Sequence, residues 1–108
     1  MTEKQLVNNY MAKHFGHKSF AGYQYIKMML EYLLHKYFEN KYLSNVKITQ
    51  LHKTLGLSIP YITFSSAVNY FLKAEHIEDK AGDFLVQTIE NILEETQNIE
   101  ITKEEDEF

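Results

Sequence analysis

The sequence contains neither cysteine nor arginine. Without cysteine the chain can form no disulfide, no thiolate nucleophile and no cysteine zinc site, which fits a reducing cytosol. No apolar run approaches the length of a membrane span, and the first ten residues, MTEKQLVNNY, lack the apolar core of a signal peptide. We therefore expect a soluble, cytoplasmic protein that makes no contact with a membrane.

The absence of arginine limits how this chain could bind DNA, because arginine is the side chain best suited to bidentate reading of guanine. Lysine–phosphate contacts and neutral side chains would have to replace it. Residues 1–73 carry nine lysines and three glutamates, a net charge of +6, whereas residues 74–108 carry two lysines and twelve acids, a net charge of −10. Such an asymmetry is typical of nucleic-acid binding or of an acidic tail.

The residue patterns of catalytic and metal sites are also lacking. The sequence has no Ser/His/Asp elbow and no glycine-rich phosphate loop, and its acids crowd one end of the chain. Five histidines are present, but His14 and His17 straddle Gly16, where a helix is expected to stop, so their rings have no fixed common face. We therefore expect a protein that is not an enzyme and that binds neither a metal nor a cofactor.

Apolar residues recur at helical spacing, and 108 residues are enough for one domain with a single modest core. Thr2 with Gln5 predicts a capping-box start to a first helix, which Gly16 ends. A long second helix is predicted from about Phe20 to Asn40. Its apolar stripe consists of Tyr23, Ile26, Leu30, Leu33, Leu34, Tyr37 and Phe38.

Three further helices complete an all-α fold of about five helices. Thr49 is expected to cap a short third helix and Asp83 the last one. Ser58 is expected to cap the fourth helix, with Pro60 in its first turn. Residues 1–98 are predicted to form a single helical domain and residues 99–108 an acidic C-terminal tail. The acidic segment of residues 74–108, with its net charge of −10, could fold back on the lysine-rich part of the chain and compete with DNA phosphates.

Residues 48–72 predict a helix-turn-helix. Leu51 and Leu55 lie four residues apart on one helical face, and Gly56 follows where a reversing chain needs a residue that tolerates positive φ. Apolar residues then return at helical spacing, at Tyr61, Phe64, Val68, Phe71 and Leu72. A helix-turn-helix offers its second helix to the DNA major groove, although the same pattern also builds an αα-hairpin that only packs.

These features occur in the order and spacing of a known family. Gly22-Tyr23-x-Tyr25-Ile26 opens the long helix, and Phe64-x-x-Ala67-Val68-x-x-Phe71-Leu72 forms the stripe of the later one. Residues 6–76, approximately, resemble the C-terminal DNA-binding domain of the sporulation response regulators of endospore-forming bacteria. The resemblance implies a helix-turn-helix whose second helix binds DNA. That helix is rich in arginine in the family and neutral here, and the resemblance carries over no phosphorylation switch, because the receiver domain is absent from the matching region.

Candidate DNA contacts follow from the exposed positions of this second helix and its flanks. The side chains that could hydrogen-bond to base edges are Ser58, Thr63, Ser66 and Asn69. Phosphate contacts would come from Lys18, Lys47, Lys53 and Lys73. The alternative for each of these residues is a helix cap or ordinary solvated surface.

Four apolar residues of the same region cannot all point into the core, and an exposed patch among them would suit a protein partner or a dimer contact. They are Ile59, Tyr61, Ile62 and Tyr70. The sequence therefore supports two functions. The first is a small helix-turn-helix protein that binds double-stranded DNA in transcriptional regulation, with homodimer pairing to strengthen a weak single module. The second is a helix-turn-helix-derived protein-interaction module, such as a phage- or plasmid-type factor that docks on a host regulator without sequence-specific DNA binding.

Overall fold

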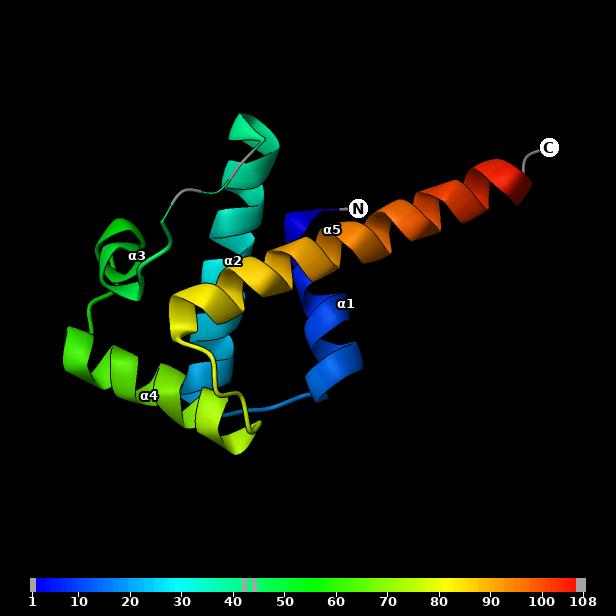
Figure 1. The fold of residues 1–108 in the computed structure, drawn as a ribbon. Helices are drawn as coiled ribbons and strands as arrows, with labels where there is room; N and C mark the ends of the chain where they lie inside the picture. Colours follow the sequence, from blue (N-terminus) through cyan, green and yellow to red (C-terminus); the bar gives the residue numbers. More distant parts are fainter. Residues whose placement is uncertain (1, 42, 44, 107–108) are drawn as a thin grey trace.

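The computed structural model describes residues 2–41, 43 and 45–106, with side chains described up to Thr96. Over these residues the fold is all-α, with five helices and no strand (Figure 1). The helices are α1 (Glu3–Phe15), α2 (Ala21–Asn40), α3 (Ile48–Thr54), α4 (Tyr61–Ala74) and α5 (Ala81–Asp106). No described helix combines the length and the apolarity that crossing a bilayer requires.

The long helix α2 is the centre of the core. It packs against α1, α4 and α5, and most extensively against α4. The predicted apolar stripe is confirmed for its first five members, which are buried, but it is wrong for Tyr37 and Phe38. Tyr37 is only partly buried and Phe38 is 40% exposed. The reason is that the C-terminal end of α2 extends past α1 and α5, so no helix covers its last turn there (Figure 1).

Gly22 allows α2 and α4 to touch through their backbones. A Cβ atom at this position would overlap the carbonyl oxygen of Ala67 on α4. Gly82 plays the same part at the start of α5, where a Cβ atom would overlap the carbonyl oxygen of Val46. At these two contacts α4 lies directly against α2, and the first turn of α5 lies directly against the segment before α3.

The start of α1 confirms the predicted capping box. The backbone N–H of Gln5 donates to Thr2 Oγ1 at 3.2 Å, and the backbone N–H of Thr2 donates to Gln5 Oε1 at 3.0 Å. Two donors that a helix start leaves without partners are thereby satisfied. Gly16 ends the helix at a positive φ of 73°, as predicted.

The predicted caps of the other helices are wrong. α3 begins one residue before Thr49, and α5 begins two residues before Asp83, so both side chains lie inside a first helical turn. The first helical hydrogen bonds reach back to the carbonyl oxygens of Lys47 and Lys80. At the start of α5, Gly82 also lies close against the backbone of Val46.

Ser58 does not cap α4 either, because Pro60 is the residue that precedes this helix. Pro60 has a helical φ of −59° but an extended ψ of 146°, and its carbonyl oxygen accepts the first helical hydrogen bond, from Phe64, at 3.1 Å. Pro60 therefore stands before the first turn rather than inside it. Ser58 is left exposed in the connecting segment.

The helix α5 continues to Asp106, so the predicted acidic tail at residues 99–108 begins within it. The side chains of that tail lie outside the described residues. The division into a domain of residues 1–98 and a tail of residues 99–108 stays a prediction.

Candidate nucleic-acid interface

The two helices α3 and α4 meet at a corner that is fixed by buried contacts. Gly56 turns the chain at a φ of +64°, as predicted. The Nε2–H of His52 on α3 donates to the carbonyl oxygen of Ile59 at 2.7 Å. The same imidazole packs against the rings of Tyr61 and Phe64, with centroid distances of 5.6 and 5.2 Å. This arrangement fits a helix-turn-helix and an αα-hairpin equally, so the helix-turn-helix assignment stays a prediction.

The helix α4 is amphipathic. Its inner side buries Phe64, Val68, Phe71 and Leu72. Its exposed side, which we term the α4 outer face, consists of Ile62, Thr63, Ser66, Asn69, Tyr70 and Lys73. The structure therefore brings three of the four predicted base-contacting residues, Thr63, Ser66 and Asn69, onto one exposed surface. The fourth, Ser58, is exposed in the segment that precedes α4.

The predicted partner-binding residues divide into two pairs. Ile62 and Tyr70 are 74% and 62% exposed, the highest values among the large apolar side chains described as exposed, and both lie on the α4 outer face. Ile59 and Tyr61 are instead partly buried against the core, because the corner formed with His52 encloses them. Ile62 was expected only as a partner contact, but its exposure beside Ser66 makes it part of the same surface as the base-contacting candidates.

Three of the four predicted phosphate-binding lysines lie on or next to α3 and α4 and have no acidic partner among the described residues. Lys47 precedes α3, Lys53 lies in its last turn, and Lys73 lies in the last turn of α4. None of the three forms a salt bridge with a described carboxylate, and all are exposed. Lys18 differs, because its Nζ lies 3.7 Å from Glu75 Oε1. A phosphate contact from Lys18 would require this ion pair to open.

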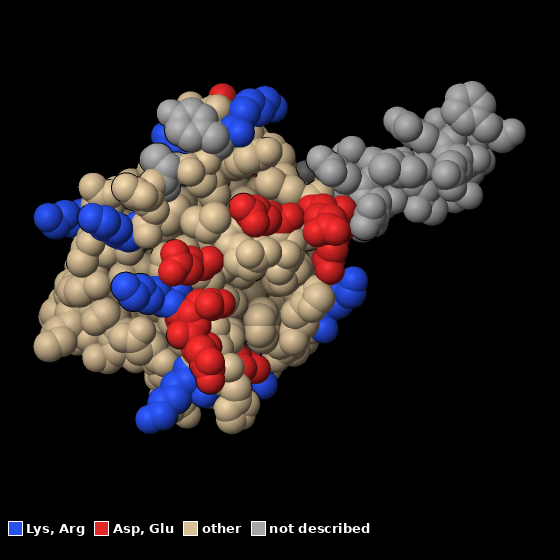
Figure 2. Space-filling view, viewed as in Figure 1, with Lys and Arg blue, Asp and Glu red and all other residues tan. Residues whose placement is uncertain are grey.

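The part of the sequence that contains α3 and α4 has no acidic residue. Between Glu39 and Glu75 the sequence contains no aspartate or glutamate, and its only charged residues are Lys41, Lys47, Lys53 and Lys73. All of α3 and α4 belong to this stretch. Figure 2 shows carboxylates in a row that runs from α5 over the connection between α4 and α5, while the part of this face formed by α3 carries lysines. The sequence already contained this signal, since it needs only the positions of the acids.

Two described acids, Glu75 in the segment before α5 and Glu95 on α5, pair with other parts of the molecule. Glu95 Oε1 lies 2.8 Å from His14 Nε2 and 3.4 Å from Lys13 Nζ, both on α1. Burial acts to raise the pKa of Glu95, but hydrogen bonds from His14 and Lys13 outweigh it and the pKa is lowered. These contacts join α5 to α1.

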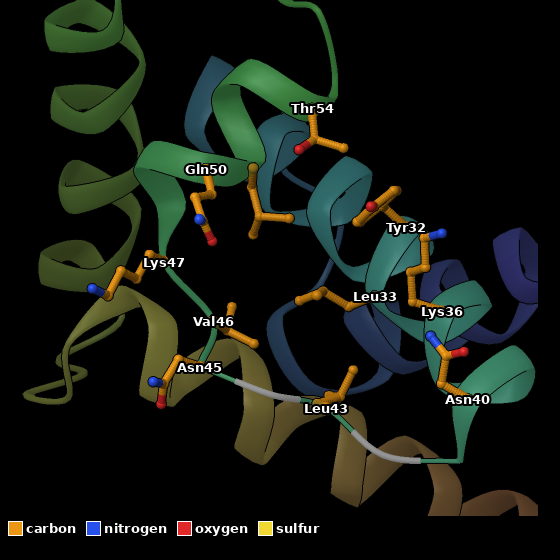
Figure 3. Close-up of a pocket in the computed structure, with 11 residues that line it drawn as sticks. Tyr32, Leu33, Lys36, Asn40, Leu43, Asn45, Val46, Lys47, Gln50 and Thr54 are labelled. Carbon is orange, nitrogen blue, oxygen red and sulfur yellow. The ribbon is translucent and has the colours of Figure 1, made fainter.

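A small hollow lies next to this surface, between the C-terminal end of α2, the segment before α3, and α3 itself (Figure 3). Its volume is about 230 Å³, and Leu33 and Leu51 line it together with amide and lysine side chains. Ligand pockets usually measure about 300–1,000 Å³. Among the described residues, no three histidine or acidic side chains come together as a metal site.

Comparisons with models of known protein families, with curated proteins and with solved structures find no match to this chain. The case for a functional surface therefore depends on the geometry and chemistry of α3 and α4.

Proposed function

We propose that this chain is a small DNA-binding protein of the helix-turn-helix type that acts in transcriptional regulation, with α4 as its recognition helix. The observation that carries the proposal is that α3 and α4 contain no acid and that exposed hydrogen-bonding side chains of α4 occur together with exposed lysines on or next to these two helices. Phosphate contacts position a protein on DNA, and base contacts in the major groove give it specificity. The α4 outer face supplies the second kind of contact, and the surrounding lysines supply the first.

The number of cations sets the expected strength of binding. Each phosphate that a lysine neutralises releases counterions, so affinity falls steeply as salt concentration rises. Lys47, Lys53 and Lys73 give only three such contacts without opening an ion pair. We therefore propose that two copies bind together, on half-sites about 34 Å apart on one side of the duplex.

The test is a gel shift with a pool of random-sequence duplexes at about 50 and 200 mM salt. The full chain is compared with the Lys53→Glu/Lys73→Glu variant. Lys4→Glu/Lys27→Glu is the matched control, because it makes the same charge change in the groove between α1 and α2. We expect salt-sensitive binding that the first variant loses and the control largely keeps. Absence of binding at low salt, or an equal loss in both variants, would contradict the proposal.

A second function is favoured by one observation, the exposure of Ile62 and Tyr70, which lie about two turns apart on the α4 outer face. Large apolar and aromatic side chains of this kind are typical of protein–protein hot spots. The alternative is therefore a protein-interaction module that docks on a partner, such as a host regulator, through this face. An aromatic-centred contact would respond little to salt, whereas binding through lysines would weaken steeply.

A further inference from the structure

We infer that the α4 outer face reads A·T base pairs in the major groove and discriminates against G·C. This inference rests on the proposed DNA-binding function and adds the class of site that the protein recognises. The face presents one amide, two aliphatic hydroxyls, one phenol and one branched aliphatic side chain, together with a single lysine at its far end.

The side chains that recognise a G·C pair are missing where they would be needed. Guanine is read by arginine or lysine at its O6 and N7 atoms, and cytosine by a carboxylate that accepts from N4. The α4 outer face contains no arginine and no acid. Its lysine, Lys73, follows Ile62 by eleven residues, which is about 16 Å along the helix axis. Lys73 lies in the last turn of α4, one turn beyond Asn69, so it is placed to meet a phosphate rather than a base edge.

The side chains that recognise an A·T pair are present and free. Asparagine can bond bidentately to N6 and N7 of adenine, and an aliphatic side chain can pack on the methyl group of thymine. The Asn69 amide is exposed and makes no hydrogen bond to any described residue, and Ile62 is 74% exposed. A thymine methyl group would cover an isoleucine that the fold otherwise leaves in water.

The spacing places these two residues on one stripe. Ile62, Ser66 and Asn69 follow each other by four and then three residues, so they share one side of the helix. From the first to the last the stripe is about 10 Å long, close to the rise of three base pairs. Ser66, between them, can donate to or accept from several bases and so tolerates either orientation of an A·T pair.

The test uses duplexes that remove single groups from the bases. Sites are first enriched from the random pool with the full chain, and the bound duplexes are sequenced. We expect A·T pairs at the centre of each half-site. Replacing the central thymines by uracil, which lacks the methyl group, should weaken wild-type binding about 4-fold, the value of one buried methyl group. The Ile62→Ala variant should bind the thymine and uracil duplexes equally well.

The adenine contact is tested in the same way. Replacing the central adenines by 7-deazaadenine, which lacks N7, should weaken wild-type binding about 5-fold or more and leave the Asn69→Ala variant unaffected. The control is Lys53→Glu, which should weaken binding to all duplexes by the same factor. Both Ile62 and Asn69 are exposed, so circular dichroism should show that these variants fold.

Two kinds of failure can be told apart. Enriched sites with central G·C pairs, or a uracil effect of equal size in wild type and Ile62→Ala, would overturn this inference while the proposed function stands. Failure to bind any duplex at low salt would overturn the proposed function and this inference with it.

Discussion

His35 joins two helices through both nitrogens of its ring. Its Nδ1 lies 3.1 Å from Oε1 of Glu3 on α1, and its Nε2 lies 3.0 Å from Oε1 of Glu39 on α2. Both nitrogens can donate to carboxylates only when the imidazole is protonated. The hydrogen bond to Glu3 and the charge of Glu39 therefore raise the pKa of His35 above its ordinary value. Hydrogen bonds from its own backbone N–H and from His35 lower the pKa of Glu3.

This cluster predicts how stability depends on pH. The raised pKa of His35 contributes stability that is fully present below its ordinary value of 6.5 and is lost as the pH rises through the folded-state value. The lowered pKa of Glu3 contributes stability above 4.5 that is lost as the pH falls through its folded-state value. In urea unfolding, His35→Gln should therefore destabilise the protein more at about pH 5.5 than at about pH 8.5.

The matched control for this prediction is His17→Gln, because His17 is exposed and has no carboxylate partner among the described residues. Its effect on the free energy of unfolding should differ little between the two pH values. A loss in His35→Gln that is the same at both pH values would show that the imidazole stabilises the fold without its charge.

At the scale of the helices, the contact of α2 with α4 depends on a missing side chain. Gly22→Ala would drive a Cβ atom into the carbonyl oxygen of Ala67 and separate the two helices. Overpacking of this kind costs about 1–3 kcal/mol. The same substitution in an exposed helix interior stabilises by about 1 kcal/mol, so the sign of the change is the test. Thermal or urea unfolding should show a less stable protein, and a gain in stability would contradict this packing.

The helices themselves could be predicted from the sequence, but most of their starts could not. The buried residues of α2 and α4 recur at helical spacing, and that period depends only on the chain itself. The capping box of Thr2 is also local, because its partner is three residues away. Thr49, Ser58 and Asp83 were equally good caps by residue type. Residue type alone did not show that the first helical hydrogen bonds reach back to Lys47, Pro60 and Lys80 instead. At the start of α5 the close approach of Gly82 to Val46 is a contact distant in sequence, which a cap pattern cannot reveal.

The exposed residues of the candidate surface could also be predicted from helical periodicity, but their contacts with distant parts of the chain could not. The buried positions of α4 fix which of its residues face outward, so Thr63, Ser66 and Asn69 were correctly expected to be exposed. The ion pair of Lys18 could not be foreseen, since three helices separate Lys18 from Glu75 in the sequence. The enclosure of Tyr61 likewise depends on His52, from the preceding helix.

At the scale of the whole molecule, charge is unevenly distributed along the chain. The residues between Glu39 and Glu75, which include all of α3 and α4, carry four lysines and no acid. The part of α5 with described side chains carries four acids and no lysine. The described acid Glu95 is held by Lys13 and His14, away from α3 and α4. The acids of α5 other than Glu95 would repel a phosphate backbone that approached from that side. Under the proposed DNA-binding function, this repulsion would favour approach of a duplex from the α3 and α4 side, where the α4 outer face lies.

The most direct test of this account is to map the DNA contact onto the chain by NMR. Backbone amide signals of the full protein are followed while a duplex enriched from the random pool is added. We predict that the shifted signals fall within residues 47–73, on α3, the turn and α4, and that signals of α1 and of the acidic part of α5 stay unchanged. Shifts confined to α1 or α5, or no shift at low salt, would contradict the assignment of α4 as the DNA-binding surface.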